Sequence, residues 1–191
     1  MKKQNKMIID PDTKPVHPWA MYNSEYHILI AQITKTGSST WRAIPGINFT
    51  NKWEHIDIEQ RDIRKTTKLV IILRDPHERF ISAANMMFRS NKAQLWKLWH
   101  ADDYLNRDIH FRNQADFVAN YKEFTNIDYW FYNKNICEEV NNHYNLGIDN
   151  VMWYRRNERT EDIFRVMNQE WIEEKYRRDY DLIARTKFIN T

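Results

Sequence analysis

Short apolar runs, each ending in a polar turn, recur along the chain and alternate with segments of helical periodicity. The runs at 27–33 (HILIAQI) and 68–74 (KLVIILR) are almost continuously apolar, which is typical of strands buried on both faces. Two further strands are predicted at 127–132 and 150–155. Because helical segments separate these runs, the pattern predicts an α/β fold in which a parallel β-sheet is flanked by helices.

The helical segments carry apolar residues at spacings of three and four. The clearest is the last, in which Ile172, Tyr176, Tyr180 and Ile183 fall on one face while charged residues cover the rest. Helices are predicted at 38–44, 77–90, 91–105, 114–122, 135–145 and 171–185.

The chain has 191 residues, the length of one domain, and residues 1–191 are interpreted as a single domain. Three of its five prolines, Pro11, Pro15 and Pro18, precede the first predicted strand. Proline interrupts both helices and strands, so residues 1 to about 24 are expected to form an irregular N-terminal arm.

Composition narrows the class of protein. No apolar run approaches the ~18 residues of a membrane span, and the N-terminus lacks the apolar segment of a signal peptide. The single cysteine, Cys137, excludes an internal disulfide and a cysteine-based metal cluster. We therefore expect a cytoplasmic protein without a membrane span. A net charge of +3 suits an anionic ligand but is too small for a protein that coats nucleic acid, so no nucleic-acid partner is expected.

The turn after the first predicted strand is rich in groups that bind oxyanions. The start of a helix offers main-chain N–H groups, glycine lets the chain curl around an anion, and hydroxyls add donors. Its lysine precedes the glycine, whereas in the common phosphate loop the lysine follows the glycines. An ordinary capped turn between strand and helix is the alternative. The candidate ligand-binding residues are Lys35, Thr36, Gly37, Ser38, Ser39 and Thr40.

A second turn of this kind follows the strand at 68–74. Arg74 closes the strand, and Ser82 lies eight positions later on the next predicted helix. Ligands of open α/β sheets bind beyond the carboxyl ends of the strands, where both turns should lie. An arginine fork and a hydroxyl suit a second phosphate. The alternative is a structural ion-pair cluster of Arg74, Asp75 and Arg79, and for Arg79 this is the preferred interpretation.

Together the two turns resemble the cofactor motifs of sulfotransferases that use 3′-phosphoadenosine 5′-phosphosulfate (PAPS). ITKTGSSTW (33–41) followed by VIILRDPHERFISA (70–83) is most similar to the carbohydrate, Golgi-type sulfotransferases, and weaker similarity extends over residues 26–184. The resemblance implies a P-loop-like nucleotide-binding fold. It also implies that residues 35–40 grip the 5′-phosphosulfate and that Arg74 and Ser82 grip the 3′-phosphate. Thr34 stands where the family has proline, and the membrane anchor of the animal enzymes is absent, so the chain looks like a compact cytosolic relative.

The resemblance also implies a mechanism. Lys35 would neutralise the bridging oxygen as the S–O bond to the leaving phosphate breaks, which requires no metal. A general base must take the proton of the acceptor hydroxyl. His55 matches the position of a catalytic histidine in the related uronyl sulfotransferases, and the ordinary imidazole pKa of ~6.5 suits this role. Glu54 is the rival base, and a packing role for His55 is the third interpretation.

Two other classes of function stay open at this stage. A nucleotide-phosphate kinase would need an acidic metal ligand at a strand end, which Asp75 could supply, and a lysine after the glycine, which is missing. A non-catalytic nucleotide-binding protein is the third class, although the intact Lys35, Arg74 and Ser82 argue against it. The acceptor is a hydroxyl compound, with a saccharide among the candidates, and the segment 91–113 is expected to shape its pocket.

Overall fold

The structure of the protein is a computed structural model that describes residues 19–38, 41, 53–58, 63, 66–88, 109–148 and 169–191. Several predictions made from the sequence lie outside these residues: the helix at 91–105, the strand at 150–155, and the roles of Ser39 and Thr40. Of the segment 91–113 only its last residues, from Ile109 on, are described.

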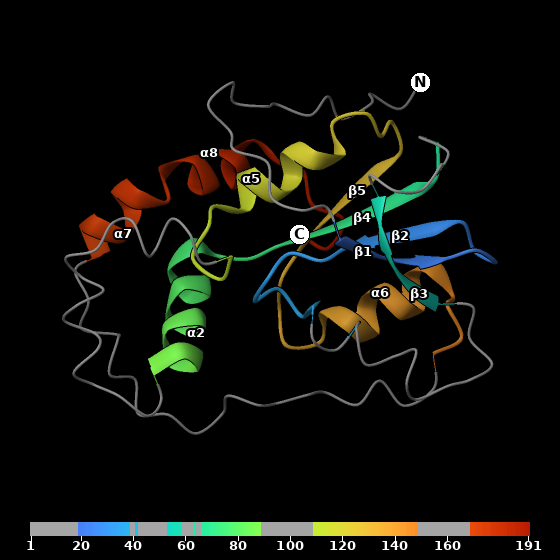
Figure 1. Ribbon diagram of the computed structural model, residues 1–191, viewed down its shortest axis with the longest axis horizontal. Helices are drawn as coiled ribbons and strands as arrows, with labels where there is room; N and C mark the ends of the chain where they lie inside the picture. The colour runs from blue at the N-terminus through green and yellow to red at the C-terminus, as the bar shows by residue number, and fades with distance from the viewer. Residues whose placement is uncertain are drawn as a thin grey trace.

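The described chain is an α/β domain built on a sheet of five strands, as Figure 1 shows. The order across the sheet is β3-β1-β2-β4-β5, so the two strands that precede the candidate turns, β2 and β4, are neighbours. The strands are β1 (Trp19–Asn23), β2 (Ile28–Ala31), β3 (Trp53–Asp57), β4 (Lys68–Leu73) and β5 (Ile127–Phe131).

The sheet is mixed, so the prediction of a parallel sheet is correct only for part of it. Strands β2, β4 and β5 are mutually parallel, whereas β1 runs antiparallel to both β2 and β3. The reason is the short turn at 24–27 between β1 and β2, since parallel strands need a long crossover and a tight turn can join only antiparallel ones. Asn23 shapes this turn, because its side-chain oxygen accepts the main-chain N–H groups of Glu25 (2.9 Å) and Tyr26 (3.1 Å).

Part of the predicted irregular N-terminal arm is a β-strand in the structure. Residues 19–23 form a strand inside the sheet, between β3 and β2, and not a loop packed on it. Ala20 and Met21 are completely buried, one on each face of the sheet. The prediction of irregular structure was therefore wrong for these residues.

The helices agree with most of the predicted segments. The predicted helix at 171–185 is divided at Tyr176, whose main chain leaves the helical conformation (φ −106°, ψ 22°). The Tyr176 ring is buried against Phe80, and its hydroxyl donates to the carbonyl of Phe111 (2.8 Å), so packing accounts for the break. The described elements are α2 (Pro76–Phe88), α5 (Gln114–Val118), the 3₁₀ turn η2 (Ala119–Tyr121), α6 (Ile136–Tyr144), α7 (Gln169–Lys175) and α8 (Arg177–Arg185).

Helices cover both faces of the sheet (Figure 1). On one face, Leu29, Leu69 and Ile71 pack with residues of α5, η2 and α8. On the other face, Ile30 and Ile72 pack with residues of α6 and with Trp41. Burial of these two apolar layers fixes the direction of each strand end, and with it the position of the turns that follow β2 and β4. Within the described residues, no helix combines the length and the apolar character required to cross a bilayer.

The outer edge of β5 is covered by the C-terminal segment. Phe188 forms an isolated parallel bridge beside Tyr129, and the Ile189 N–H donates to the Tyr129 carbonyl (2.9 Å). The Asn190 amide accepts the Phe131 N–H (2.9 Å) and donates to the Phe131 carbonyl (3.0 Å). The segment therefore satisfies an edge that would otherwise be open to pairing with other chains.

Candidate anion-binding site

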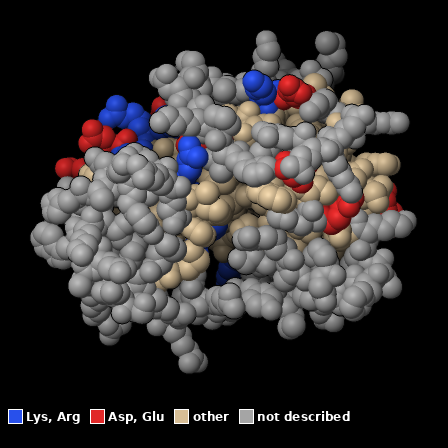
Figure 2. Space-filling model, in the orientation of Figure 1, with Lys and Arg blue, Asp and Glu red and all other residues tan. Residues whose placement is uncertain are grey.

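The turns that follow β2 and β4 meet at the carboxyl end of the sheet. The two strands are parallel neighbours, so both turns emerge at the same edge. The Arg74 guanidinium donates to the carbonyl of Lys35 across 3.2 Å, which joins the two turns directly. Figure 2 shows a hollow between the regions of α2 and α6, with Lys or Arg atoms deep inside it. The predicted meeting of the two candidate turns is therefore observed.

The first turn is curled by two positive φ angles. Lys35 has φ 67° and Gly37 has φ 90°, and the Thr36 hydroxyl donates to the Ile33 carbonyl (2.9 Å). A helix begins at Ser38, as the Trp41 N–H bonded to the Gly37 carbonyl (3.4 Å) indicates. A glycine is required where φ reaches 90°, and the curl leads directly into a helix N-terminus, the arrangement that binds oxyanions.

Lys35 is a half-buried cation in a cationic environment. Its ammonium donates to the thioether sulfur of Met86 at 3.6 Å, and sulfur is a weak acceptor. Burial, together with the nearby positive charges of Arg74 and Arg79, lowers the pKa of Lys35 from 10.5 to about 8. A bound anion would pair with the ammonium and so offset both the burial and the repulsion from the two arginines.

Arg74 is held from three sides. Its guanidinium lies 4.6 Å from the centre of the Tyr132 ring, and Glu78 approaches its other nitrogen at 3.7 Å. Its main-chain N–H and carbonyl are both bonded to the side chain of Gln114. Burial lowers the pKa of Arg74, and Tyr132 and Glu78 oppose this shift. The guanidinium is thus fixed toward the Lys35 turn.

Ser82 belongs to the face of α2 that is turned toward both cations. Glu78, Ser82 and Met86 are four residues apart, and residues at this spacing lie on one face of a helix. Glu78 contacts Arg74 and Met86 contacts Lys35. Ser82 lies between them on this face and is half-buried, and its role as a ligand of the second phosphate stays a prediction.

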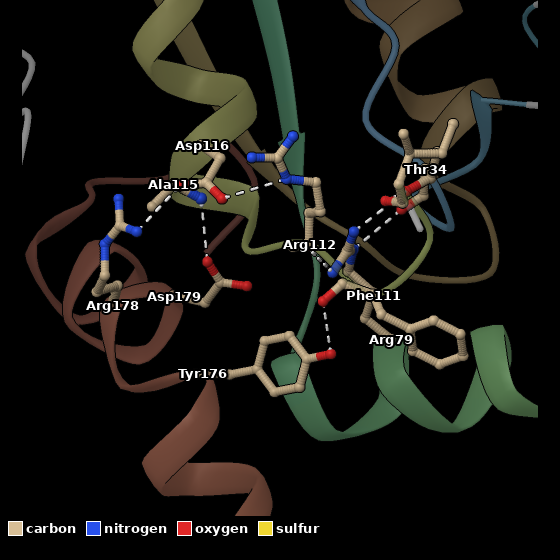
Figure 3. A network of polar contacts seen from close by, with 10 residues as sticks. Thr34, Arg79, Phe111, Arg112, Ala115, Asp116, Tyr176, Arg178 and Asp179 are labelled. Atoms are coloured by element: carbon tan, nitrogen blue, oxygen red, sulfur yellow. Dashed lines mark hydrogen bonds and ion pairs between the residues drawn. The ribbon is translucent and has the colours of Figure 1, made fainter. Parts of the chain in front are cut away.

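Arg79 is bonded to buried groups of the protein itself, which agrees with the structural role preferred for it from the sequence. Its side chain is fully buried and donates to the Thr34 carbonyl (3.0 Å), the Thr34 hydroxyl (3.1 Å) and the Arg112 carbonyl (2.7 Å), as Figure 3 shows. These partners differ from the predicted Asp75. The Thr34 hydroxyl in turn donates to the Ile109 carbonyl (2.9 Å), so Thr34 anchors the start of the turn.

The candidate base His55 lies on β3, two strands away from β2, the strand that precedes the Lys35 turn. His55 pairs with Met21 in the middle of β3, and Met21 pairs with Ile30 of β2. Strand β1 separates β3 from β2, so the His55 main chain lies about 10 Å from Ile30 at ~4.8 Å per strand. The assignment of His55 or Glu54 as base stays a prediction.

Three residues near the site were not predicted. Gln114 and Tyr132 hold Arg74, and His110 follows Ile109, whose carbonyl receives the Thr34 hydroxyl. Tyr132 ends the predicted strand 127–132, so its place beside Arg74 follows once β4 and β5 are paired. Gln114 and His110 are separated from the motifs by long stretches of chain, and their types alone give no signal.

Among the described residues, no three His, Cys, Asp or Glu side chains form a cluster that could hold a metal ion. Comparison of the chain with protein-family models, with curated proteins and with solved structures finds no match.

Proposed function

We propose that the chain is a sulfotransferase that transfers a sulfuryl group from PAPS to an acceptor hydroxyl. The observation that carries this proposal is the hydrogen bond from the Arg74 guanidinium to the Lys35 carbonyl. It joins two turns suited to oxyanions at one edge of the sheet. Two neighbouring half-buried cations suit a ligand with two anionic groups, such as a nucleotide with 5′- and 3′-phosphates. The family resemblance supports the same ligand.

Each residue has a distinct role in this proposal. Lys35 and the turn 36–40 bind the 5′-phosphosulfate, while Arg74 and Ser82 bind the 3′-phosphate. As the acceptor oxygen bonds to sulfur, the S–O bond to the 5′-phosphate breaks, and Lys35 stabilises the charge left on the phosphate oxygen. His55 takes the proton of the acceptor hydroxyl, with Glu54 as the alternative base.

A nucleotide-phosphate kinase is less well supported. It needs a carboxylate for magnesium at the strand end, and Asp75 is the candidate. However, the Asp75 side chain accepts the main-chain N–H of Glu78 (2.9 Å) and so caps α2. A non-catalytic nucleotide-binding protein is the remaining alternative, since the same two turns would serve binding alone.

Calorimetry with adenosine 3′,5′-bisphosphate, the product nucleotide, tests the proposal. We expect binding with a chelator present, and much weaker binding of ATP with magnesium. The Arg74→Ala variant should lose roughly 1.5–3 kcal/mol of binding free energy for the bisphosphate and much less for adenosine 5′-monophosphate. A strict magnesium requirement would support the kinase instead. An equal loss for both nucleotides would show that Arg74 does not bind the 3′-phosphate.

Activity itself requires an acceptor. A screen of hydroxyl compounds, saccharides first, with labelled PAPS would identify the acceptor class. A chain that binds the bisphosphate and transfers nothing to any acceptor would favour the non-catalytic alternative. The cytoplasmic location and the absence of a nucleic-acid partner also stay predictions from the sequence.

A further inference from the structure

Gln114 forms an unusual pair of hydrogen bonds with the main chain of Arg74. Its side-chain oxygen accepts the Arg74 N–H at 2.9 Å, and its side-chain nitrogen donates to the Arg74 carbonyl at 2.7 Å. Gln114 is completely buried and lies 40 residues further along the chain. One primary amide therefore satisfies both main-chain groups of the arginine that faces the candidate ligand.

The position of Arg74 in the sheet explains why these bonds matter. Leu73 is the last residue of β4, and its carbonyl still accepts the Tyr132 N–H (2.7 Å) at the end of the β4–β5 pairing. Arg74 is the first residue beyond that pairing. Without a substitute for the neighbouring strand, its main chain would be free to rotate, and its long side chain would sweep a large volume. Gln114 acts as this substitute.

Gln114 is itself held in place by the C-terminal helix. It is the first residue of α5, and the N-cap residue Asn113 makes no side-chain hydrogen bond to this helix. The cap comes from Asp179 of α8, whose carboxylate accepts the Ala115 N–H at 3.0 Å (Figure 3). Asp179 is completely buried. A rigid connection therefore runs from α8 through the start of α5 to Arg74.

We propose that Gln114 is a positioning residue, which fixes the main chain of Arg74 and thereby directs the guanidinium at the 3′-phosphate. This inference rests on the proposed function. With the main chain fixed, the guanidinium is placed by Tyr132 on one side and by the Lys35 carbonyl on the other. Gln114 would then contribute to affinity for the 3′-phosphate without touching it.

The test compares Gln114→Ala with the matched control Asn113→Ala, which alters the neighbouring side chain but leaves the pair of bonds to Arg74. Gln114→Ala should weaken binding of adenosine 3′,5′-bisphosphate roughly tenfold, about the effect of one hydrogen bond, and that of the 5′-monophosphate less than about twofold. In an Arg74→Ala background, the same change should have no further effect on affinity. Asn113→Ala should behave like the wild type.

Gln114→Glu supplies a second readout that a general loss of stability would not reproduce. A protonated carboxyl can accept from the Arg74 N–H and donate to its carbonyl, as the amide does, whereas an ionised one cannot donate. Affinity of this variant, expressed relative to the wild type at each pH, should recover at acid pH and fall as pH rises. The ratio for Gln114→Ala should stay constant.

The outcomes separate the two proposals. Equal losses for both nucleotides, or a loss that persists without Arg74, would overturn the positioning role. If the wild type binds neither nucleotide, the proposed function fails, and hydrogen exchange of the Arg74 amide decides whether Gln114 holds it. Exchange should be faster in Gln114→Ala, or in Gln114→Leu if the alanine variant does not fold, because neither side chain can accept the Arg74 N–H. If the exchange rate of the Arg74 amide is unchanged, Gln114 does not hold the Arg74 main chain, and the positioning role is refuted as well.

Discussion

At the scale of single residues, the charge of Lys35 is the feature most sensitive to conditions. Burial and two neighbouring arginine charges lower its pKa to about 8, because each disfavours the protonated amine. A bound phosphate acts in the opposite direction and raises the pKa in the complex. Binding is therefore linked to proton uptake over the interval between the two values.

This linkage predicts how nucleotide affinity changes with pH. Below pH 8 the free protein already carries the charge, so affinity for adenosine 3′,5′-bisphosphate should be nearly constant once the phosphates are ionised. Above pH 8 affinity should fall, by up to tenfold per pH unit, because the ammonium must first be protonated. Calorimetry between pH 7 and about 9.5 measures this. Lys35→Arg keeps its charge throughout and should show no such fall; an identical fall in that variant would assign the titration to another group.

The choice of general base is also a question of single residues. If His55 accepts the proton, His55→Ala should reduce turnover by ~10²–10⁴-fold and leave affinity for the bisphosphate unchanged, since the base touches only the acceptor. Assays with labelled PAPS and an identified acceptor measure both. Glu54→Gln is the control for the rival carboxylate, and His110→Ala for the histidine next to Ile109, whose carbonyl accepts the Thr34 hydroxyl. Full activity of His55→Ala with loss in either control would transfer the role to that residue.

At the scale of elements, the sequence predicts the strands that have a clear local pattern of apolar residues. It misses the strands that are defined by the neighbouring strands they pair with. The strands β2 and β4 are continuous apolar runs, and both were located from the sequence together with the turns that follow them. Strand β1 was missed because it begins directly after Pro18, at the end of a proline-rich segment that predicts irregular structure. Strand β3 is equally short, and only its pairing with β1 defines it.

The turn after β2 yields a prediction at this scale. Gly37→Ala places a side chain at φ 90°, and the new methyl group would lie 3.5 Å from the Cys137 sulfur, an ordinary contact. The cost is therefore one of backbone strain, about 1–3 kcal/mol, and not of steric overlap. Urea unfolding should show this loss, and affinity for the bisphosphate should fall because the curl of the turn changes.

Gly147→Ala is the matched control for this change. Gly147 also has a positive φ (62°), but it lies near Tyr26, in the turn at the opposite end of β2 from Lys35. It should lose a similar amount of stability and keep the affinity of the wild type. If both variants lose affinity equally, the effect reflects general destabilisation and not the shape of the Lys35 turn.

At the scale of the whole molecule, the site is supported by a buried polar layer between the sheet and the C-terminal helices (Figure 3). Arg79 holds Thr34 before the first turn, and Asp179 holds the start of α5, which holds Arg74. The sequence could not predict this layer. Its members come from distant segments, and their roles as partners follow only from the packing of α8 beside α5.

Asp179 is the residue through which this layer can be tested. It is fully buried, and among the charges around Arg79 it is the one that most favours the protonated guanidinium. Asp179→Ala removes that charge and the cap of α5 together, and it should cost about 1–3 kcal/mol in urea unfolding, as expected when the buried Ala115 N–H loses its acceptor. Asp179→Asn keeps an acceptor for the Ala115 N–H and should cost less. The control Asp181→Ala alters an exposed carboxylate two residues further on and should stay within about 0.5 kcal/mol of the wild type.

The same Asp179 variants also test whether the buried polar layer affects nucleotide affinity at the candidate site. Where enough Asp179→Asn remains folded, its affinity for adenosine 3′,5′-bisphosphate should resemble that of the wild type, because the acceptor that orders α5 and Gln114 is preserved. Asp179→Ala should bind the bisphosphate more weakly and the 5′-monophosphate nearly normally, since only the hold on Arg74 is loosened. If Asp179→Ala proves as stable as Asp181→Ala, the buried layer does not support the fold. If it is unstable but keeps full affinity when folded, α8 stabilises the domain without positioning the candidate site.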